Sequence, residues 1–243
     1  ELYVTPYGGT YYYAFNATMA PYDDPMVRSA LSMAIDRDRI TTDVSPGNVA
    51  AYSFVPPSIS GGYEVQPPSW AAMSQEERTA MAKGVMEAAG YTADNPMKVV
   101  INYNTSEGHK QIALAISDMW AEIGVAVELF NQDVGTHYDG LQAQEFEIGR
   151  AGWIWDYPDA ENLLALMGPN SPYNYGKYNN AEFNALLEAS YTQTGDERIA
   201  TMQAAEAIAM EEAALAPIYY YNSKHLVGSY VEGWVANGDD RHP

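Results

Sequence analysis

Cysteine is absent from this 243-residue sequence. Without thiols the chain forms no disulfide, thiolate zinc site or iron–sulfur cluster, and it has no cysteine nucleophile. Basic side chains are also scarce: 12 Lys and Arg stand against 32 Asp and Glu, which gives a net charge of −20 at pH 7. Because neutralising phosphates requires clustered Lys and Arg, this balance argues against nucleic-acid binding and against docking on an anionic membrane surface.

Long apolar runs are missing too. No stretch approaches the roughly eighteen consecutive apolar residues that a membrane-spanning helix needs. The first residues, Glu1 to Val4, carry neither an initiator methionine nor the pattern of a secretory leader. We therefore expect that a leader has been removed or that the chain is a piece of a longer protein. With 47% hydrophobic and 18% charged residues, the composition is typical of a folded globular chain.

Catalytic and metal-binding motifs are absent as well. The sequence contains no G-x-S-x-G, no Walker loop, no G-x-G-x-x-G and no HExxH. Its four histidines lie far apart, without the spacing of a zinc site; they are His109, His137, His225 and His242. We expect no metal and no cofactor.

Strand and helix patterns alternate in the middle of the chain. Strands are predicted over 97–103, 125–130 and 146–153, with helices over 109–123 and 135–142 between them. Short connections of this kind imply parallel pairing, so we predict an α/β fold with a mainly parallel sheet flanked by helices. Further strands are predicted over 10–16 and 217–221, and further helices after Asp24, after Ser74, over 179–191 and over 194–214. No internal repeat or linker divides residues 1–243, which predicts a single domain.

Residues 150–161 concentrate charged and aromatic side chains. Arg150 lies toward the C-terminal end of a predicted buried strand, the edge where open α/β sheets bind ligands. Trp153 and Trp155 offer flat walls, and Asp156 follows them. A carboxylate beside indole rings can receive an ammonium group through charge-assisted hydrogen bonds and cation–π contact.

Two other interpretations of this segment stay open. Asp156, Asp159 and Glu161 are the residue types of a glycosidase-like acid pair. The same spacing is typical of a helix N-terminus, with Asp159 as N-cap and Glu161 in the first turn. Alternatively, Arg150 and Asp156 form only a structural ion pair.

The segment at 150–164 reads RAGWIWDYPDAENLL and resembles a signature of the bacterial extracellular solute-binding proteins, family 5, which are the oligopeptide- and dipeptide-binding proteins of ABC importers. Four more stretches are similar to that family in the expected order: TYYYAFNATMAPYDDPMVRSALSMAIDRDRI, GNVAAYSFVPPSISGG, AAGYTADNPMKVVINYNTSEGHKQIA and APIYYYNSKHLV. Together they cover nearly the whole chain.

The resemblance implies one lobe of a two-lobed, type II-like periplasmic-binding-protein fold. Residues 1–243 are similar only to the second, C-terminal ligand-binding lobe, so we expect an excised lobe without the first one. By the same resemblance, Asp156 meets the α-ammonium of a peptide, and Arg150 and His109 are cations that meet its carboxylate, near Asn104. The resemblance also assigns backbone and pocket positions beside the peptide to Gly152, Trp153 and Ile154.

Two departures from the family pattern concern ligand length and side-chain preference. Val134 stands where the oligopeptide binders carry a tryptophan, and Leu141 where they carry an arginine. The implied function is peptide capture in the periplasm and delivery to inner-membrane ABC permease subunits, by a monomer that is not an enzyme. The alternatives are another cargo in the same fold, such as an oligosaccharide or a metal chelate, and a glycosidase-like enzyme using Asp156 and Glu161.

Overall fold

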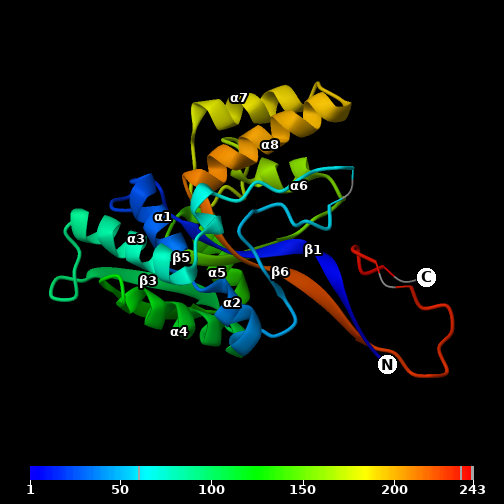
Figure 1. The fold of residues 1–243 in the computed structure, drawn as a ribbon, viewed down its shortest axis with the longest axis horizontal. Helices are drawn as coiled ribbons and strands as arrows, with labels where there is room; N and C mark the ends of the chain where they lie inside the picture. The colour runs from blue at the N-terminus through cyan, green and yellow to red at the C-terminus, as the bar shows by residue number, and fades with distance from the viewer. Residues whose placement is uncertain (60, 236, 242–243) are drawn as a thin grey trace.

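A six-stranded sheet forms the centre of the molecule (Figure 1). The computed structural model describes residues 1–59, 61–235 and 237–241, so His242 lies outside the described residues. The strand order is β2-β6-β1-β5-β3-β4. The strands are β1 (Leu2–Phe15), β2 (Val49–Ala50), β3 (Met97–Asn104), β4 (Val125–Gln132), β5 (Ile148–Ile154) and β6 (Leu215–Leu226).

The α/β class with a helix-flanked sheet is confirmed, but the prediction of a mainly parallel sheet is wrong. β3 is parallel to β4 and β5, as the short connections through helices require. β1 is antiparallel to β5 and β6, and β2 is antiparallel to β6. The sheet is mixed because the long strands β1 and β6, which come from opposite ends of the chain, pair at its centre.

Helices cover both faces of the sheet (Figure 1). Their starts follow local signals: Asp24 caps the first helix, and Ser74 with Glu77 forms the predicted capping box of the third. The α-helices are α1 (Pro25–Met33), α2 (Arg37–Arg39), α3 (Gln75–Ala88), α4 (Glu107–Ala121), α5 (Val134–Ala143), α6 (Ala160–Leu164), α7 (Ala181–Ser190) and α8 (Gly195–Glu211). None of the helices in the described ranges is long and apolar enough to cross a membrane.

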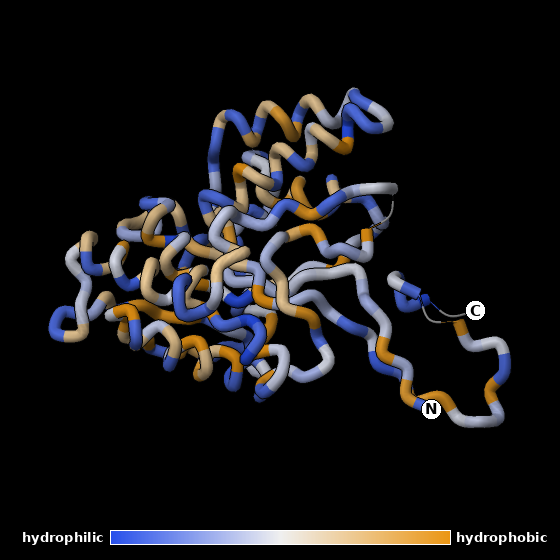
Figure 2. Tube along the Cα trace, viewed as in Figure 1, coloured by the Kyte–Doolittle hydropathy of each residue, from blue (hydrophilic) through white to orange (hydrophobic). Residues whose placement is uncertain are grey.

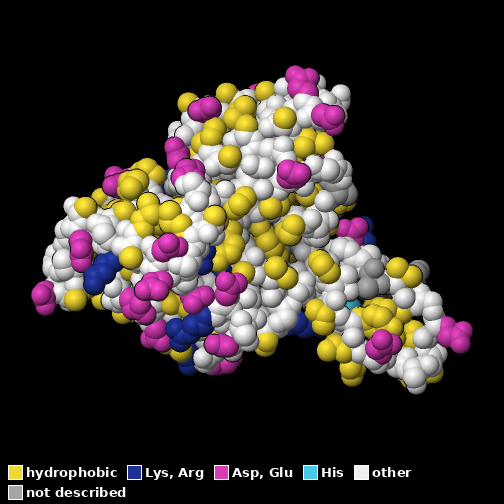
Figure 3. Space-filling model, in the orientation of Figure 1, with side chains coloured by type: hydrophobic (Ala, Val, Ile, Leu, Met, Phe, Trp, Pro, Cys, Tyr) yellow, Lys and Arg dark blue, Asp and Glu magenta, His cyan; other side chains and the backbone are white. Residues whose placement is uncertain are grey.

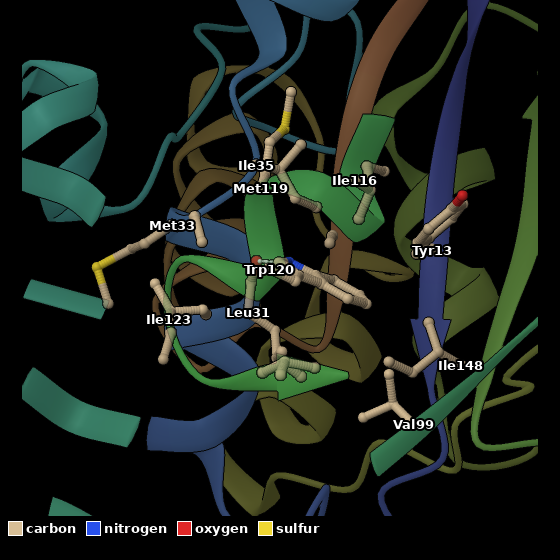
Figure 4. Packing of buried hydrophobic residues seen from close by; sticks show 14 of the residues in the cluster. Tyr13, Leu31, Met33, Ile35, Val99, Ile116, Met119, Trp120, Ile123 and Ile148 are labelled. Atoms are coloured by element: carbon tan, nitrogen blue, oxygen red, sulfur yellow. Dashed lines mark hydrogen bonds between the residues drawn. The ribbon is translucent and has the colours of Figure 1, made fainter. Parts of the chain in front are cut away.

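One hydrophobic core lies between the sheet and α1, α3 and α4 (Figure 4). Trp120 of α4 is fully buried at its centre, and its indole N–H donates to the carbonyl of Leu31 in α1 at 2.9 Å. Val99 of β3, Tyr13 of β1 and Ile148 of β5 supply the sheet side of this core. Residues of β4 and β6 also belong to this core, so it ties the sheet from β6 to β4 to one helical layer.

A second core covers the opposite face of the sheet, under α5 to α8. Hydrophobic and hydrophilic stretches alternate along α7 and α8 (Figure 2), and each of these helices buries one side. Tyr12 and Ala14 of β1 point into this core, whereas Tyr11 and Tyr13 belong to the first one. This alternation is the period of two expected of a strand that is buried on both faces.

The Pro-rich segment over 45–59 and 61–69 is mainly loop and contains the short strand β2. Glu206 of α8 holds it from inside the second core. Its carboxylate is fully buried and accepts hydrogen bonds from the main-chain N–H groups of Phe54, Val55 and Gln66 and from the hydroxyl of Tyr63, at 2.8–3.0 Å.

Acidic side chains are scattered over the face shown in Figure 3 and do not gather in one patch. On this face the acidic side chains are therefore spread out rather than concentrated at one site.

Candidate functional site

Arg150 of β5 is a buried cation surrounded by neutral oxygens. It is 8% exposed, and its guanidinium donates to Asn104 Oδ1 and the Tyr138 hydroxyl at 3.1 Å and to the Tyr221 hydroxyl at 3.2 Å. Its Nε has no hydrogen-bond partner in the described residues. Arginine stays protonated in proteins, so a full positive charge is held here with part of its donor capacity unused.

The aromatic ring of Tyr11 lies under this charge. The guanidinium carbon of Arg150 is 4.7 Å from the ring centroid, within cation–π range. The Tyr11 hydroxyl lies 3.4 Å from Nδ1 of His109, near the start of α4. The structure thus brings three predicted residues, Arg150, His109 and Asn104, into one cluster.

His109 is neutral at pH 7 in the unliganded protein. Burial, followed by the positive charge of Arg150, lowers the pKa of His109 from 6.5 to about 4. The prediction that His109 meets a carboxylate as a cation therefore concerns the protein with its ligand bound. The cluster holds the permanent charge of Arg150 and the imidazole of His109, which a nearby carboxylate would help to protonate.

Among the described residues, no carboxylate forms an ion pair with Arg150. The ion pairs recorded in the described ranges join Arg198 to Asp159 and His225 to Asp240. The alternative of a structural ion pair between Arg150 and Asp156 is therefore wrong. Because an unpaired buried charge is costly, a site of this kind favours an anionic ligand group.

β5 offers an open strand edge beyond Arg150. β3 pairs only with Ile148 and Gly149 of β5, whereas β1 pairs with the strand along its full length. The N–H of Trp155 bonds to the carbonyl of Gly8 in β1, so in this antiparallel register alternate residues turn their main-chain groups away from β1. Those residues are Arg150, whose carbonyl meets Nε2 of His137 at 2.7 Å, then Gly152 and Ile154.

Gly152 is required by a close approach. A Cβ at this position would collide with the hydroxyl of Tyr221, the same group that accepts from Arg150. Any larger residue would displace a partner of the buried cation. The glycine therefore serves the cluster as well as the open edge.

Asp156 lies just past the end of β5, exposed to solvent. Its Oδ2 accepts from the side-chain amide of Asn162 at 3.3 Å, and its main-chain N–H donates to Asn162 Oδ1 at 3.1 Å. The indole N–H of Trp153 also donates to Asn162 Oδ1, at 3.1 Å. The acidic end of the segment is thus organised separately from Arg150, six residues away.

The two tryptophans do not form a pair of walls. Trp153 is partly exposed and lies against Tyr173, with ring centroids 4.7 Å apart. Trp155 is 8% exposed, contacts the backbone at Gly8 closely and donates to Asp239 at 2.8 Å. Of the two indole rings, only that of Trp153 is accessible to a ligand, because Trp155 is buried by its packing contacts.

The acid-pair interpretation loses support from the same region. Asp159 caps α6 and accepts two hydrogen bonds from Arg198, at 2.7 and 2.9 Å. Glu161 accepts from the hydroxyl of Tyr157 at 2.6 Å. Asp159 therefore has the N-cap role that the alternative interpretation predicts. Among the described residues, no three His, Asp or Glu side chains gather closely enough to hold a metal ion.

Sequence reasoning missed several members of the site. Tyr221 comes from β6, Tyr11 from β1 and Tyr138 from α5, and their hydroxyls or rings surround Arg150. The excess of tyrosine, 20 against 5 phenylalanines, was the available signal. It could not say which tyrosines converge, because that depends on the pairing of β1 with β5 and β6.

The chain matches one family model and several known proteins. The model of the bacterial extracellular solute-binding proteins, family 5 Middle, matches residues 1–175. The periplasmic murein peptide-binding protein MppA of Escherichia coli is 39% identical over 243 residues, which are 99% of this chain and 45% of that protein. The periplasmic oligopeptide-binding protein OppA of the same organism is 38% identical, over 97% of this chain and 44% of its own length.

A solved structure agrees with these sequence matches. Haemophilus influenzae OppA in complex with the peptide RPPGFSPFR superposes with a TM-score of 0.90 at 35% identity. The match covers 99% of this chain and 47% of that one. The chain therefore spans less than half the length of the relatives it matches.

Proposed function

Because the chain belongs to the bacterial extracellular solute-binding proteins, family 5, we propose that it is the ligand-binding lobe of a periplasmic protein that captures short peptides. Residues 1–243 would form the C-terminal lobe, and the remaining half of the relatives' length would correspond to the lobe that closes over the ligand. The names of the relatives, murein peptide-binding and oligopeptide-binding, support a peptide as cargo.

One observation carries the proposal: an open strand edge lies between an unpaired buried cation and an exposed carboxylate. Arg150 in β5 and Asp156 just past its end are six residues apart, which is about 20 Å of extended chain. The long side chain of Arg150 shortens the distance that a ligand must bridge. The gap suits an extended peptide of a few residues, which carries one charge of each sign at its ends.

The peptide would lie antiparallel to β5. Its carboxylate meets Arg150, with His109 and Asn104 beside it, and its ammonium group meets Asp156. Main-chain groups of Gly152 and Ile154 hydrogen-bond the peptide backbone whatever its sequence, and Trp153 flanks the amino-terminal end. No nucleophile, metal or cofactor takes part in this binding.

We also propose that the protein is located in the periplasm, which the relatives' names support, and that it delivers peptides to inner-membrane ABC permease subunits. Closure of the two lobes over a peptide would provide the surface that the permease recognises. We propose that the whole protein acts as a monomer and catalyses no reaction.

The test measures peptide binding to the full-length protein by calorimetry, with free and N-acetylated forms of one peptide. In a closed, desolvated site, removing one partner of an ion pair costs roughly 3–5 kcal/mol. Asp156→Ala should therefore weaken binding of the free peptide at least about a hundredfold, and acetylation should weaken binding to the wild type similarly. The two losses should not add, since both delete the same interaction.

Glu161→Gln is the matched control, because it changes a neighbouring carboxylate whose hydrogen bond among the described residues comes from the hydroxyl of Tyr157. Free-peptide affinity should stay unchanged in this variant. Undiminished binding of the acetylated peptide to the wild type would overturn the amino-terminal anchor. Steady hydrolysis of a chromogenic glycoside, abolished by Glu161→Gln, would favour the enzyme instead.

A further inference from the structure

Asp156 has little to hold it in place. It follows the last residue of β5, is exposed, and in the described residues its carboxylate is recorded with one hydrogen bond, to Asn162. An exposed carboxylate loses rotamer entropy when it is fixed by a ligand, which weakens the contact. A partner that orders Asp156 beforehand would remove that cost.

Asn162 is such a partner, because it is itself rigid. It belongs to α6 and is 8% exposed. The helix start is fixed by Asp159, which caps it and is held in turn by two hydrogen bonds from Arg198 of α8. The amide of Asn162 thus projects from an anchored helix toward the end of β5.

The orientation of this amide follows from its partners. Oδ1 accepts from the main-chain N–H of Asp156 and from the indole N–H of Trp153, both at 3.1 Å. A flipped amide would set its NH₂ group against these two donors, so the oxygen must face them. Nδ2 is therefore directed to Asp156 Oδ2, which leaves Oδ1 of that carboxylate for a ligand.

We propose that Asn162 is the positioning residue of the amino-terminal anchor, holding the carboxylate of Asp156 and the indole of Trp153 in the arrangement that receives an ammonium group. This inference rests on the proposed function. An amide is required because it accepts two hydrogen bonds and donates a third from one planar group, which neither a carboxylate nor an apolar side chain does.

Asn174 provides a matched control. It is 5% exposed and likewise fully engaged, but its amide donates to the carbonyls of Met167, Gly168 and Tyr178, none of which is a residue of the site. Its role is to hold a turn. Replacing it should lower stability without changing how the ligand's amino terminus is recognised.

The experiment uses the full-length protein and one peptide in free and N-acetylated forms. The measured quantity is the dissociation constant of the acetylated peptide divided by that of the free peptide. A large ratio means that the protein recognises the free amino terminus. Asn162→Leu, close in shape but without the amide, should reduce the ratio about tenfold relative to the wild type, or about 1.4 kcal/mol. Asn162→Ser replaces the leucine variant if that variant does not fold. The serine side chain is too short to reach both partners, so it should reduce the ratio similarly. Asn174→Ala should lower the melting temperature and leave the ratio unchanged.

Two further results separate the inference from the proposed function. The double variant Asp156→Ala/Asn162→Leu should give a ratio no lower than that of Asp156→Ala alone, because Asn162 acts through Asp156. If the wild type, Asn162→Leu and Asn162→Ser all discriminate equally well between the free and the acetylated peptide, the role of Asn162 is overturned. The proposed function is then unaffected. A wild type that binds both peptides equally overturns both.

Discussion

Arg37 and Arg150 are both buried, at 0% and 8% exposure, and both lie over aromatic rings. Neither has a carboxylate partner in the described part of the chain. Their donors differ. Nε of Arg37 bonds two main-chain carbonyls at 2.8 Å, and its other nitrogens bond two more carbonyls and the hydroxyl of Ser32. Within the part of the chain that the structure describes, Arg150 donates to side-chain oxygens alone, and its Nε has no partner.

The difference teaches that burial alone does not mark a functional charge. Main-chain carbonyls are fixed in place, so Arg37 joins α2 to β6 and to the loop after β2 permanently. The hydroxyls of Tyr138 and Tyr221 can rotate, and the amide of Asn104 sits at a strand end, so the surroundings of Arg150 can adjust to an anion. The comparison assigns Arg37 to the fold and supports the proposal that Arg150 serves the ligand.

The largest effect is expected from Arg37→Ala. Its loss leaves the carbonyls of Ala51, Pro217 and Ile35 without their donor inside the protein. Breaking buried charged networks costs about 3–5 kcal/mol, and that loss should appear in urea unfolding at pH 7. The folded fraction should bind peptide with wild-type affinity. A loss of stability under about 1 kcal/mol would contradict the structural role of Arg37.

Glu206 is the acidic counterpart of Arg37, since its buried carboxylate accepts hydrogen bonds from main-chain N–H groups that are fixed in place. Burial raises its pKa from 4.5 to about 7. The folded state therefore holds this proton more tightly than the unfolded state does. The resulting stability is full below pH 4.5 and is lost as the pH rises through 7.

Glu206→Gln removes this titration. Between pH 4.5 and pH 8 the wild type should lose about 3 kcal/mol relative to the variant, from 1.36 kcal/mol per pKa unit. Urea unfolding of both proteins across that range measures the difference, in which the remaining acidic residues cancel. Parallel curves for the two proteins would show that Glu206 does not titrate in this window.

Arg150→Met should affect binding rather than folding. We expect about a hundredfold weaker binding of a peptide with a free carboxylate, or about 2.7 kcal/mol, in the full-length protein. Replacing a buried charge by an apolar side chain is often neutral or stabilising, so the melting temperature should not fall. A C-terminally amidated peptide should bind wild type and variant alike. If instead Arg150→Met unfolds as readily as Arg37→Ala, the two arginines share a structural role.

The smallest effect concerns His109. Unliganded, its pKa is about 4 because of burial and Arg150. A ligand carboxylate offsets that charge and raises the pKa of the bound state, so binding takes up protons as the pH falls. Affinity for a free-carboxylate peptide should rise a few-fold between pH 7 and pH 5, and His109→Gln should abolish the rise. Calorimetry in buffers of different ionisation enthalpy detects the proton uptake directly; none at pH 5.5 would contradict this.

Local features of this protein were determined by the sequence itself. Asp24, Ser74 and Asp159 cap helices where their spacing predicts, because capping depends on a few neighbouring residues. The alternation from β3 to β5 predicts its parallel pairs, since short helical connections leave no other choice. The motif around Asp156 identifies the family, although Trp155 in that motif is packed rather than exposed.

Only the tertiary structure decided how the site is assembled. The antiparallel β1 and β6 bring Tyr11 and Tyr221 to Arg150, and Tyr221 lies 71 residues away from it in sequence. Strand neighbours of this kind are chosen by burial of whole sheet faces, which no local pattern reports. The charge state of His109 follows the same logic. Its pKa depends on burial and on a cation that the sequence places far away and the fold places beside it.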